Sequence, residues 1–455
     1  MNNARSPNGC HRLLLATIAR FRDSFGRGGF LGNVALLSGS TALANILVAL
    51  SGPIITRLYT PADLGVLSVF TSLVAIATSA SALRYELAFP LPKQDEEAAN
   101  LLGLAVVIQI GFFVGLSVLL LLAGRAITQW LNAPALYPYL WLVPLGFGGA
   151  GSYETLSYWL VRTNQISLLG RTKLTQSGAQ VAAQVGLGLI HGPVGLLIGD
   201  LIGRSLGSWT LWIHCYRTSS AAFRQVRWSD MLAAGYRYRR FPLMTAPASL
   251  VDMVCARLPS LVLAAAFGMT VAGSFELVTR LLLLPVMLIG RAVGTAFLAA
   301  ASKVEAHEKH HLRRLYQKLN LSLGAMAVAI SLACILPSPW LFPWVFGAEW
   351  REAGIFAAIM IPRFIAEFVA GPVNYALGAI ERQDLQLTQT IVYSFAMALA
   401  TFAVLLIPAV DARHAVMCYA AAGTIGYGTR VVMGYLAFRQ LEKLLTQPTQ
   451  PPKSE

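Results

Sequence analysis

Three charged side chains interrupt an otherwise apolar stretch, SFELVTRLLLLPVMLIGRAVG, between Ser274 and Gly294. Glu276 and Arg280 are four residues apart, and Arg291 follows eleven residues later. An α-helix turns by about 100° per residue, so all three side chains fall on one stripe of its surface. A charge at the centre of a bilayer costs roughly 2.5–3.5 kcal/mol on insertion scales. The stripe therefore predicts a polar wall that faces water, an anion or a partner charge.

Other charged residues lie within or beside apolar runs. Three pairs of opposite charge are four residues apart, so each can pair along its own helix: Asp200 with Arg204, Glu276 with Arg280, and Arg363 with Glu367. Asp252 and Arg257 are five residues apart, about 140° around a helix, and do not neutralise each other well. An arginine without a local acid needs water or an anion, and its planar fork of donors matches a phosphate.

The elements that must position these charges are membrane-spanning helices. The chain has 455 residues, of which 56% are hydrophobic and 12% charged, and its mean hydropathy is +0.60. Soluble domains have about 25% charged residues. Apolar runs between charged or Pro/Gly breaks predict twelve spans. These are residues 31–56, 63–83, 98–123, 136–160, 172–191, 194–215, 241–266, 272–300, 317–337, 354–380, 386–409 and 414–438.

The distribution of basic residues predicts the orientation of these spans. With both termini in the cytoplasm, 25 of the 35 Lys and Arg residues fall on the cytoplasmic side and four on the other side. This asymmetry is the positive-inside pattern. It explains the net charge of +14 by proximity to membrane lipid, without nucleic acid. The predicted parts are a basic cytoplasmic N-terminal segment, an N-terminal lobe, a basic cytoplasmic linker, a C-terminal lobe and a cytoplasmic tail: residues 1–30, 31–220, 221–240, 241–438 and 439–455.

Two pairs of segments suggest that the lobes are repeats. YTPADLGVLSVFTSL from Tyr59 aligns with FGMTVAGSFELVTRL from Phe267 at a spacing of 208 residues, which pairs Gly65 with Gly273. A second pair begins at Val143 and at residue 361, with a spacing of 218 residues. The matches fall on spans two and eight and on spans four and ten. A six-plus-six duplication keeps the orientation of each half, so it predicts a parallel pseudo-two-fold repeat around a central cavity.

The stretch from Arg57 to Ala105 resembles the polysaccharide exporters of the MOP flippase superfamily, which include the Wzx-type lipid-linked oligosaccharide flippases. Three motifs carry the resemblance: YTPADLG from Tyr59, RYELA from Arg84, and DEEAAN from Asp95. The resemblance implies an all-α integral membrane protein with about twelve helices in two six-helix lobes. It also implies a multi-pass protein of the bacterial inner membrane that moves a polyprenyl-pyrophosphate-linked oligosaccharide across the bilayer, with membrane lipid around it.

The resemblance gives the charged residues their expected roles. Spans one, two, seven and eight border the cavity in the family, so we expect Arg257, Arg280 and Arg291 to face the cavity and bind the pyrophosphate. Arg57 and Arg84 flank its two ends, although Arg84 is equally suited to a structural pair with Glu86. Three acids are candidates to bind H⁺ or Na⁺ in each cycle: Asp252, Glu276 and Glu367. The five scattered cysteines show no metal-binding spacing, and no cofactor is expected.

Other functions remain open from the sequence. A MATE-like cation-coupled exporter would have the same fold, but its site should favour cations, with unpaired acids in the N-terminal lobe. A polymerase or ligase of the same pathway would have a large folded outer loop. Polymerases and chain-length proteins of that pathway are also candidate partners of this chain. Export of a peptidoglycan lipid is a further alternative, although those proteins commonly have two extra C-terminal helices.

Overall fold

A computed structural model describes residues 30–189, 192–301, 309–371, 373, 383–407 and 410–446. Within these ranges every regular element is a helix. The first half contains α2 (Phe30–Leu50), α3 (Gly52–Leu58), α4 (Pro61–Thr78), η1 (Tyr85–Ala88), α5 (Asp95–Trp130), η2 (Pro134–Tyr139), α6 (Leu142–Arg162), α7 (Ile166–Gly186), η3 (Leu187–Leu189), α8 (Val194–Phe223) and α9 (Trp228–Arg237). The second half contains η4 (Phe241–Thr245), α10 (Ala246–Phe267), α11 (Met269–Ala301), α12 (Lys309–Ile330), η6 (Ser331–Ile335), α13 (Ser338–Phe346), η7 (Ala348–Trp350), α14 (Arg351–Ile359), α15 (Ile361–Ala370), α17 (Gln383–Leu406) and α18 (Ala412–Thr446).

The helices are those of a multi-pass membrane protein. Seven helices among the described residues are long and apolar enough to cross a membrane, or eight if one bent pair is a single span. Each of the twelve ranges predicted from the sequence overlaps a helix. The count of twelve spans stays a prediction, and the N-terminal basic segment lies outside the described residues.

One predicted span is bent. The range 354–380 is broken into α14 and α15, which meet at an angle of 58°. Pro362 stands in the first turn of α15, and proline has no N–H with which to continue the hydrogen bonds of α14. The break therefore follows from a proline inside the predicted span. Residue 372 and residues 374–382 lie outside the described part.

The start of α4 is fixed by its own sequence. The Thr60 hydroxyl accepts a hydrogen bond from the Asp63 backbone N–H at 3.3 Å, and the Asp63 carboxylate accepts one from the Thr60 backbone N–H at 3.0 Å. This reciprocal capping box, with Pro61 in the first turn, satisfies donors that a helix terminus leaves open. The YTPADLG motif thus fixes where α4 begins, and with it the position of Gly65 along the helix.

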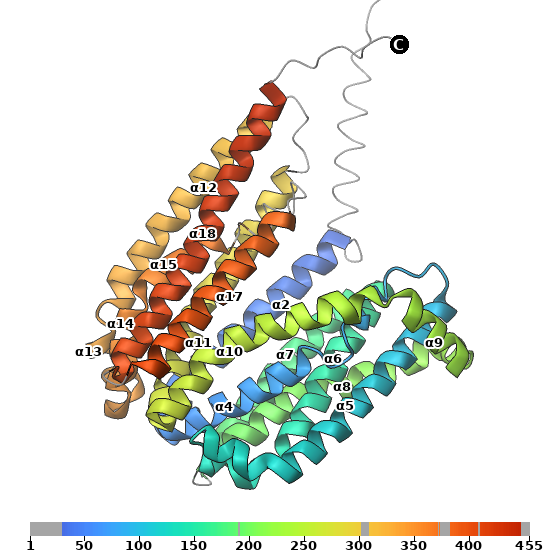
Figure 1. The fold of residues 1–455 in the computed structure, drawn as a ribbon, viewed down its shortest axis with the longest axis horizontal. Helices are drawn as coiled ribbons and strands as arrows, with labels where there is room; N and C mark the ends of the chain where they lie inside the picture. The colour runs from blue at the N-terminus through green and yellow to red at the C-terminus, as the bar shows by residue number, and fades with distance from the viewer. Residues whose placement is uncertain are drawn as a thin grey trace, which may run out of the picture.

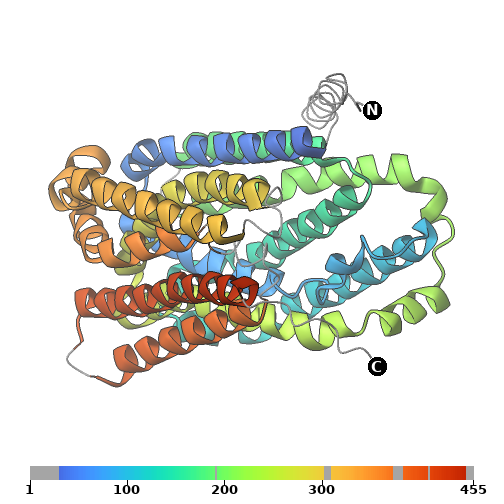
Figure 2. The ribbon, with the colours of Figure 1, turned by 90° about the horizontal axis from the view of Figure 1, so that it is seen from above.

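The helices form two groups, one from each half of the chain, that meet at one end. Figure 1 shows them converging around α4, α10 and α11, whereas the far end of α12 and α18 lies well away from α9. In Figure 2 the red and orange helices of the second half occupy one side, and the cyan and green helices α5 to α9 the other. The largest apolar core includes side chains of both groups, such as Phe70 of α4, Phe275 of α11 and Phe356 of α14.

The opposite ends have separate cores. One cluster joins the start of α5, the end of α6 and α9, and includes Phe89 and Trp159. Another joins the end of α11, the start of α12 and the end of α18, and includes Phe297, Tyr316 and Phe438. Buried apolar surface therefore joins the two groups at one end, while at the other end each group has its own core.

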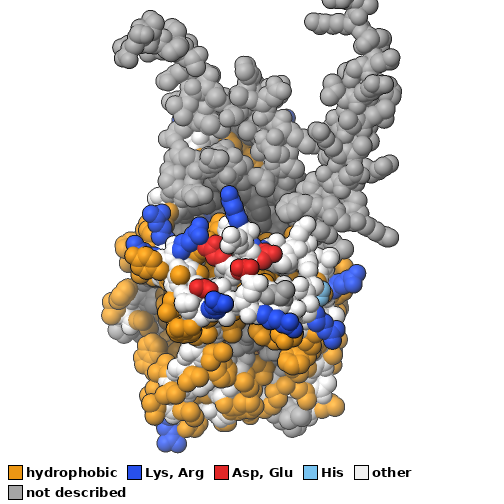
Figure 3. Space-filling view, turned by 90° about the vertical axis from the view of Figure 1, so that its right-hand side faces the viewer, with side chains coloured by type: hydrophobic (Ala, Val, Ile, Leu, Met, Phe, Trp, Pro, Cys, Tyr) orange, Lys and Arg blue, Asp and Glu red, His pale blue; other side chains and the backbone are white. Residues whose placement is uncertain are grey.

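Charged side chains mark the end that carries α9. Figure 3 shows Lys, Arg, Asp and Glu side chains in a band across this end, above a surface covered by hydrophobic side chains. Within this region Arg162 pairs with Asp95 and Arg237 with Glu97, both at 2.8 Å. Such a change from charged to apolar surface is expected where a protein leaves the hydrocarbon region of a bilayer.

Candidate functional site

The two groups touch most closely where α4 crosses α11, and we call this crossing the seam. A Cβ atom built on Gly65 would overlap the carbonyl oxygen of Met269, and one built on Gly273 would overlap that of Pro61. Pro61 and Met269 are themselves 208 residues apart, as are the two glycines. The contact is therefore reciprocal between matched positions. Only glycine allows two helix backbones to approach this closely.

Glu276 belongs to the seam. Its carboxylate accepts a hydrogen bond from the Ser68 hydroxyl at 3.1 Å, and these residues are again 208 apart. The ion pair with Arg280 on α11 is not among the described contacts. The spacing permits the pair, but the crossing helix α4 brings a hydroxyl to the carboxylate. Arg204 of α8 also lies close enough for its charge to act on Glu276.

Arg280 and Arg257 are half-buried on α11 and α10. Neither has an ion-pair partner among the residues that the structure describes. A half-buried guanidinium on an apolar helix requires water or an anion. Arg291 also lies in α11, but its side chain is outside the described part. Arg257 and Arg280 thus have no acidic partner among the described residues, and their role in binding stays a prediction.

Arg84 is engaged by two carboxylates. Its guanidinium lies 2.7 Å from Glu154 and 3.3 Å from the buried Glu86. Leu83 and Arg84 have left-handed backbone angles, with φ of 51° and 61°. Burial raises the pKa of the Glu86 carboxyl, and the ion pair with Arg84 lowers it to a smaller extent. The structural pair that we considered for Arg84 is present, with Glu154 as a second partner.

Arg57 lies near the seam, at the other end of the first group of helices from Arg84. It is exposed in the last turn of α3. Beside it, the Trp350 indole donates a hydrogen bond to the Thr56 carbonyl at 3.0 Å, which links α3 to the second group of helices. Arg57 and Arg84 are thus separated along the first group, and neither contacts Arg280 in the described contacts.

A second polar cluster fills the bundle of α15, α17 and α18. Arg363 and Glu367 form the expected pair at 3.5 Å, and the Tyr427 hydroxyl donates to Glu367 at 3.0 Å. Arg430 donates to Gln389 at 2.6 Å. Tyr427 and Gln389 were not predicted from the sequence. Tyr427 could have been, because it lies three residues before Arg430, on the same face of the helix.

Asp252 faces this cluster from α10. Its side chain is exposed, and its charge acts on Tyr393 and Arg430. The rings of Tyr393 and Tyr427 lie side by side, with their centroids 5.4 Å apart and their planes tilted by 50°. Of the three predicted acids, Asp252 and Glu367 therefore border one cluster, while Glu276 lies at the seam.

Asp200 and Arg204 form the remaining expected pair on α8. Glu154 on α6 and Asp200 on α8, two acids within predicted spans of the first half, thus both have arginine partners. No group of three or more metal-ligating side chains occurs among the described residues.

Comparisons with known proteins agree with this architecture. The family model described as "Polysaccharide biosynthesis protein" matches residues 54–355. An inward-facing multidrug resistance MATE family transporter of the MOP superfamily is 14% identical, with a TM-score of 0.68 over 90% of this chain and 95% of that chain. The lipid II flippase MurJ, in an inward closed conformation, is 12% identical, with a TM-score of 0.67 over 90% and 91%.

A MOP superfamily transporter from Pyrococcus furiosus is a third solved structure of similar fold. It is 13% identical, with a TM-score of 0.54 over 90% of this chain and 96% of that chain, and its description states a reverse polarity of the binding pocket. No curated protein matches the sequence. At these identities the solved structures establish a shared fold.

Proposed function

Because the chain belongs to the polysaccharide biosynthesis protein family and has the fold of MOP superfamily transporters, we propose that it is a flippase. Its proposed substrate is an undecaprenyl-pyrophosphate-linked oligosaccharide repeat unit of an O-antigen, capsule or exopolysaccharide. The unit moves from the cytoplasmic to the periplasmic leaflet of the bacterial inner membrane by alternating access. Transport of this kind involves no covalent step.

The single observation that carries the proposal is the arrangement of the cores. An apolar core joins the two groups of helices at the seam, and separate cores stabilise the opposite ends. Two bodies joined at one end can rock against each other, which is how alternating access operates in folds with repeated halves. With both termini in the cytoplasm, the seam is periplasmic and the diverging ends open inward.

Arginine is the residue that we assign to the pyrophosphate. Arg280 and Arg257 are half-buried and have no acidic partner among the described residues, and guanidinium binds phosphate oxygens with two parallel donors. Arg291 is roughly 16 Å from Arg280 along the helix axis and nearer the cytoplasmic end, so it meets the headgroup first. The lipid tail stays in the bilayer while the sugar crosses between the lobes.

The cation-coupled exporter is a weaker alternative despite the equal similarity of fold to a MATE transporter. A cation site requires acids that are not already neutralised. In the N-terminal half, Glu154 pairs with Arg84 and Asp200 pairs with Arg204. The description of the Pyrococcus furiosus transporter supports the idea that this fold accommodates pockets of opposite polarity. Coupling to H⁺ or Na⁺ is compatible with an anionic substrate. Asp252 and Glu276 are the better candidates for it, because neither forms an ion pair among the described residues, whereas Glu367 pairs with Arg363.

The proposal is tested by the sidedness of the accumulated lipid. In a bacterial host that lacks the gene, oriented inner-membrane vesicles should accumulate lipid-linked oligosaccharide on the cytoplasmic leaflet. The intact chain should reverse this, and Arg280→Gln should fail by at least about tenfold, since a charged hydrogen bond contributes roughly 1.5–3 kcal/mol. Arg280→Lys keeps the charge but loses the fork, so it should be intermediate.

The matched control is Arg125→Gln, because Arg125 is exposed and its guanidinium lies over the Tyr137 ring at 5.5 Å. It should transport normally. Accumulation on the periplasmic leaflet would contradict the proposal and indicate a polymerase or ligase step. Normal transport by a well-folded Arg280→Gln protein would remove Arg280 from the site.

A further inference from the structure

The helix α9 has three kinds of surface around its circumference. At about 100° per residue, Met231 and Ala234 fall in one sector, and both are buried in the core at the start of α5. Trp228, Leu232 and Tyr236 follow one another at steps of one turn in the adjoining sector, and they are 60%, 53% and 70% exposed. The last sector holds Ser229, Asp230, Ala233 and Arg237. Buried, exposed apolar and polar sectors together are the pattern of a helix that lies where protein, lipid and water meet.

Contacts at both ends of α9 hold it across the first turns of α5. The Arg227 backbone N–H donates a hydrogen bond to the Asn100 side-chain oxygen at 2.9 Å. At the other end, the Arg237 guanidinium pairs with Glu97 at 2.8 Å. These two contacts are about 15 Å apart along α9 but only about 4.5 Å apart along α5, so α9 crosses α5 rather than running beside it. Figure 1 shows α9 at the right-hand end of the molecule, where α5 begins.

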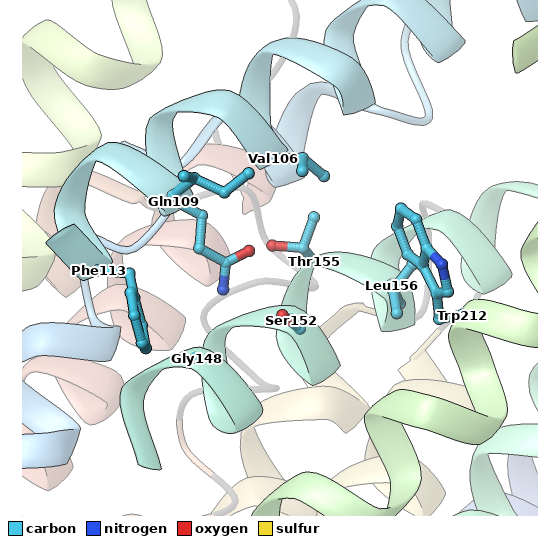
Figure 4. A pocket seen from close by; sticks show the side chains of 9 residues that line it. Val106, Gln109, Phe113, Gly148, Ser152, Thr155, Leu156 and Trp212 are labelled. Atoms are coloured by element: carbon cyan, nitrogen blue, oxygen red, sulfur yellow. The ribbon is translucent and has the colours of Figure 1, made fainter. Parts of the chain in front are cut away.

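This crossing lies at the edge of the hydrocarbon region. The stretch of α5 without charged residues, 98–124, is about 40 Å long, and its middle is near Gly111. The hydrocarbon region is about 30 Å thick and so extends about ten residues to either side of that middle, almost to Asn100. A groove of about 270 Å³ between α5, α6 and α8 lies at the middle level, and Figure 4 shows Gln109 and Phe113 in its lining. None of the side chains described around the groove is charged, as expected of a surface within the lipid.

Arginines without acidic partners flank the exposed sector of α9. Arg224 and Arg227 precede it, and Arg239 and Arg240 follow it. All four are exposed, and none forms an ion pair among the described residues. The Arg239 guanidinium lies over the Tyr236 ring, 4.3 Å from its centroid, which joins a positive charge to the exposed apolar sector. Figure 3 shows Lys and Arg side chains across this end of the molecule, beside hydrophobic ones.

The apolar sector and the flanking charges together select the chemistry of the partner. Exposed tryptophan, leucine and tyrosine side chains are stabilised by contact with acyl chains, and tryptophan and tyrosine are typical of the membrane interface. Guanidinium groups bind phosphate oxygens with paired donors. A zwitterionic headgroup carries an ammonium group that offsets its phosphate. Four arginines without acidic partners therefore favour a lipid with a net negative charge.

We propose that α9 and its flanking arginines bind anionic phospholipid in the leaflet at this end of the molecule. The acyl chains contact the exposed apolar sector, and the phosphodiester is held by Arg227 or Arg239. Since α9 lies in the segment that connects the two halves of the chain, the bound lipid holds this connection at the membrane surface. The proposal needs a membrane but no particular cargo, so it holds whether or not the arginines of α10 and α11 bind a pyrophosphate.

The test measures which lipid touches the exposed sector in the full-length chain. A bimane fluorophore is attached at Leu232→Cys after the five native cysteines are replaced. The protein is placed in phosphatidylcholine nanodiscs with increasing amounts of either phosphatidylglycerol or phosphatidylcholine that carries a quenching nitroxide near the top of one acyl chain. Half of the maximal quenching should require at least about fivefold less phosphatidylglycerol, since one arginine near a membrane surface contributes about 1 kcal/mol. A fluorophore at Ala233→Cys, in the polar sector, should be quenched weakly by both lipids.

Two variants each remove one charge, one from each flank. Arg227→Gln and Arg239→Gln should each reduce the preference for phosphatidylglycerol by about two- to fivefold, and sodium chloride at about 0.5 M should reduce it as well. Arg125→Gln is the matched control, because it removes an exposed arginine near the other end of α5. It should leave the preference unchanged. A fluorophore at Tyr236→Cys repeats the measurement in the same sector, so that poor folding of one labelled protein does not decide the result.

Three results would overturn the proposal. Equal quenching by the two lipids would show that the sector touches the bilayer without selecting charge. Absence of quenching by either lipid would show that water or another part of the chain covers the sector, and aqueous iodide separates these cases, since it quenches only a fluorophore exposed to water. A preference that Arg227→Gln and Arg239→Gln both retain, in proteins that stay monodisperse, would show that the flanking arginines do not hold the lipid.

Discussion

The arginines of this protein differ in whether an acidic side chain pairs with them. Arg84 is held by Glu86 and Glu154, whereas Arg280 has no acidic partner among the described residues. The first arginine is thereby neutralised within one group of helices, and the second remains available to an anion. Burial of Glu86 in the same cluster opposes its ionisation, because a carboxylate loses its hydration there.

A prediction at this scale concerns the pH dependence of stability. Burial raises the pKa of Glu86 above its ordinary value of 4.5. Between 4.5 and the raised pKa the folded protein holds a proton that the unfolded chain has lost, so stability falls as pH rises through that interval. Glu86→Gln removes this fall. We therefore compare the thermal midpoints of the two proteins in detergent. The midpoint of Glu86→Gln minus that of the unmodified protein should increase by about 1–3 °C as pH rises above 4.5.

The control for this measurement is Glu349→Gln, which changes an exposed carboxylate. Its difference from the unmodified protein should not vary with pH in the same interval. A Glu86→Gln protein that becomes relatively less stable as pH rises would contradict the prediction. That outcome would mean that attraction to Arg84 outweighs the burial of the carboxylate.

At the scale of elements, the crossing of α4 and α11 decides how the halves are joined. Each helix contributes a glycine to the crossing. One turn further along, the Ser68 hydroxyl donates a hydrogen bond to Glu276. The contact is reciprocal between positions 208 residues apart, which supports the proposed duplication. The complete pseudo-two-fold arrangement of two six-helix lobes remains a proposal, as do the boundaries of the lobes.

Gly65→Ala should disrupt this crossing. The added methyl group would overlap a backbone carbonyl of α11, which cannot move aside as a flexible side chain could. Overpacking costs about 1–3 kcal/mol, so the thermal midpoint and the rate of transport should both fall. Gly273→Ala should behave in the same way, since its methyl group meets the matched carbonyl of α4.

Glycines on the lipid-facing side provide the comparison. Gly111 and Gly115 of α5 have open space around them. Gly111→Ala and Gly115→Ala should leave stability unchanged or raise it by about 1 kcal/mol, because alanine is the better helix former. If Gly65→Ala unfolded at the same temperature as Gly111→Ala, the close seam would not exist in the folded protein.

The whole molecule has its apolar cores distributed unevenly. One core crosses between the groups at the seam, and two smaller clusters lie at the diverging ends. Separation of the diverging ends therefore exposes little shared core, whereas separation of the seam breaks the main one. Rocking about the seam is the motion that this distribution favours, and it agrees with the shape in Figure 1.

This motion can be measured with pairs of spin labels in a chain whose five native cysteines are replaced. Ala233→Cys with Gln317→Cys reports on the diverging ends, and Gln129→Cys with Glu349→Cys on the seam end; all four positions are exposed. With undecaprenyl pyrophosphate in nanodiscs, the first distance should shorten in part of the population and the second should lengthen. If both distances changed in the same direction, or neither changed, rocking would be excluded.

Much of the fold could be predicted because helical hydrogen bonds are local. A bilayer requires every backbone group to be satisfied within its own segment, so apolar runs and caps position the helices of a multi-pass protein. The YTPADLG capping box and the pairs Asp200–Arg204 and Arg363–Glu367 follow from spacing along one helix. Family membership, carried by short motifs in the first half, was also within reach of the sequence.

The tertiary structure decided which groups meet across helices. Spacing allowed Glu276 to pair with Arg280, but α4 brought Ser68 to it instead. Packing between helices also brought the Tyr427 hydroxyl to Glu367. It left the side-chain nitrogen of Gln109, a lone amide in an apolar run, without a hydrogen-bond partner. Sequence spacing fixes neighbours only along one helix. Partners on other helices depend on crossing points that arise from the packing of the whole chain.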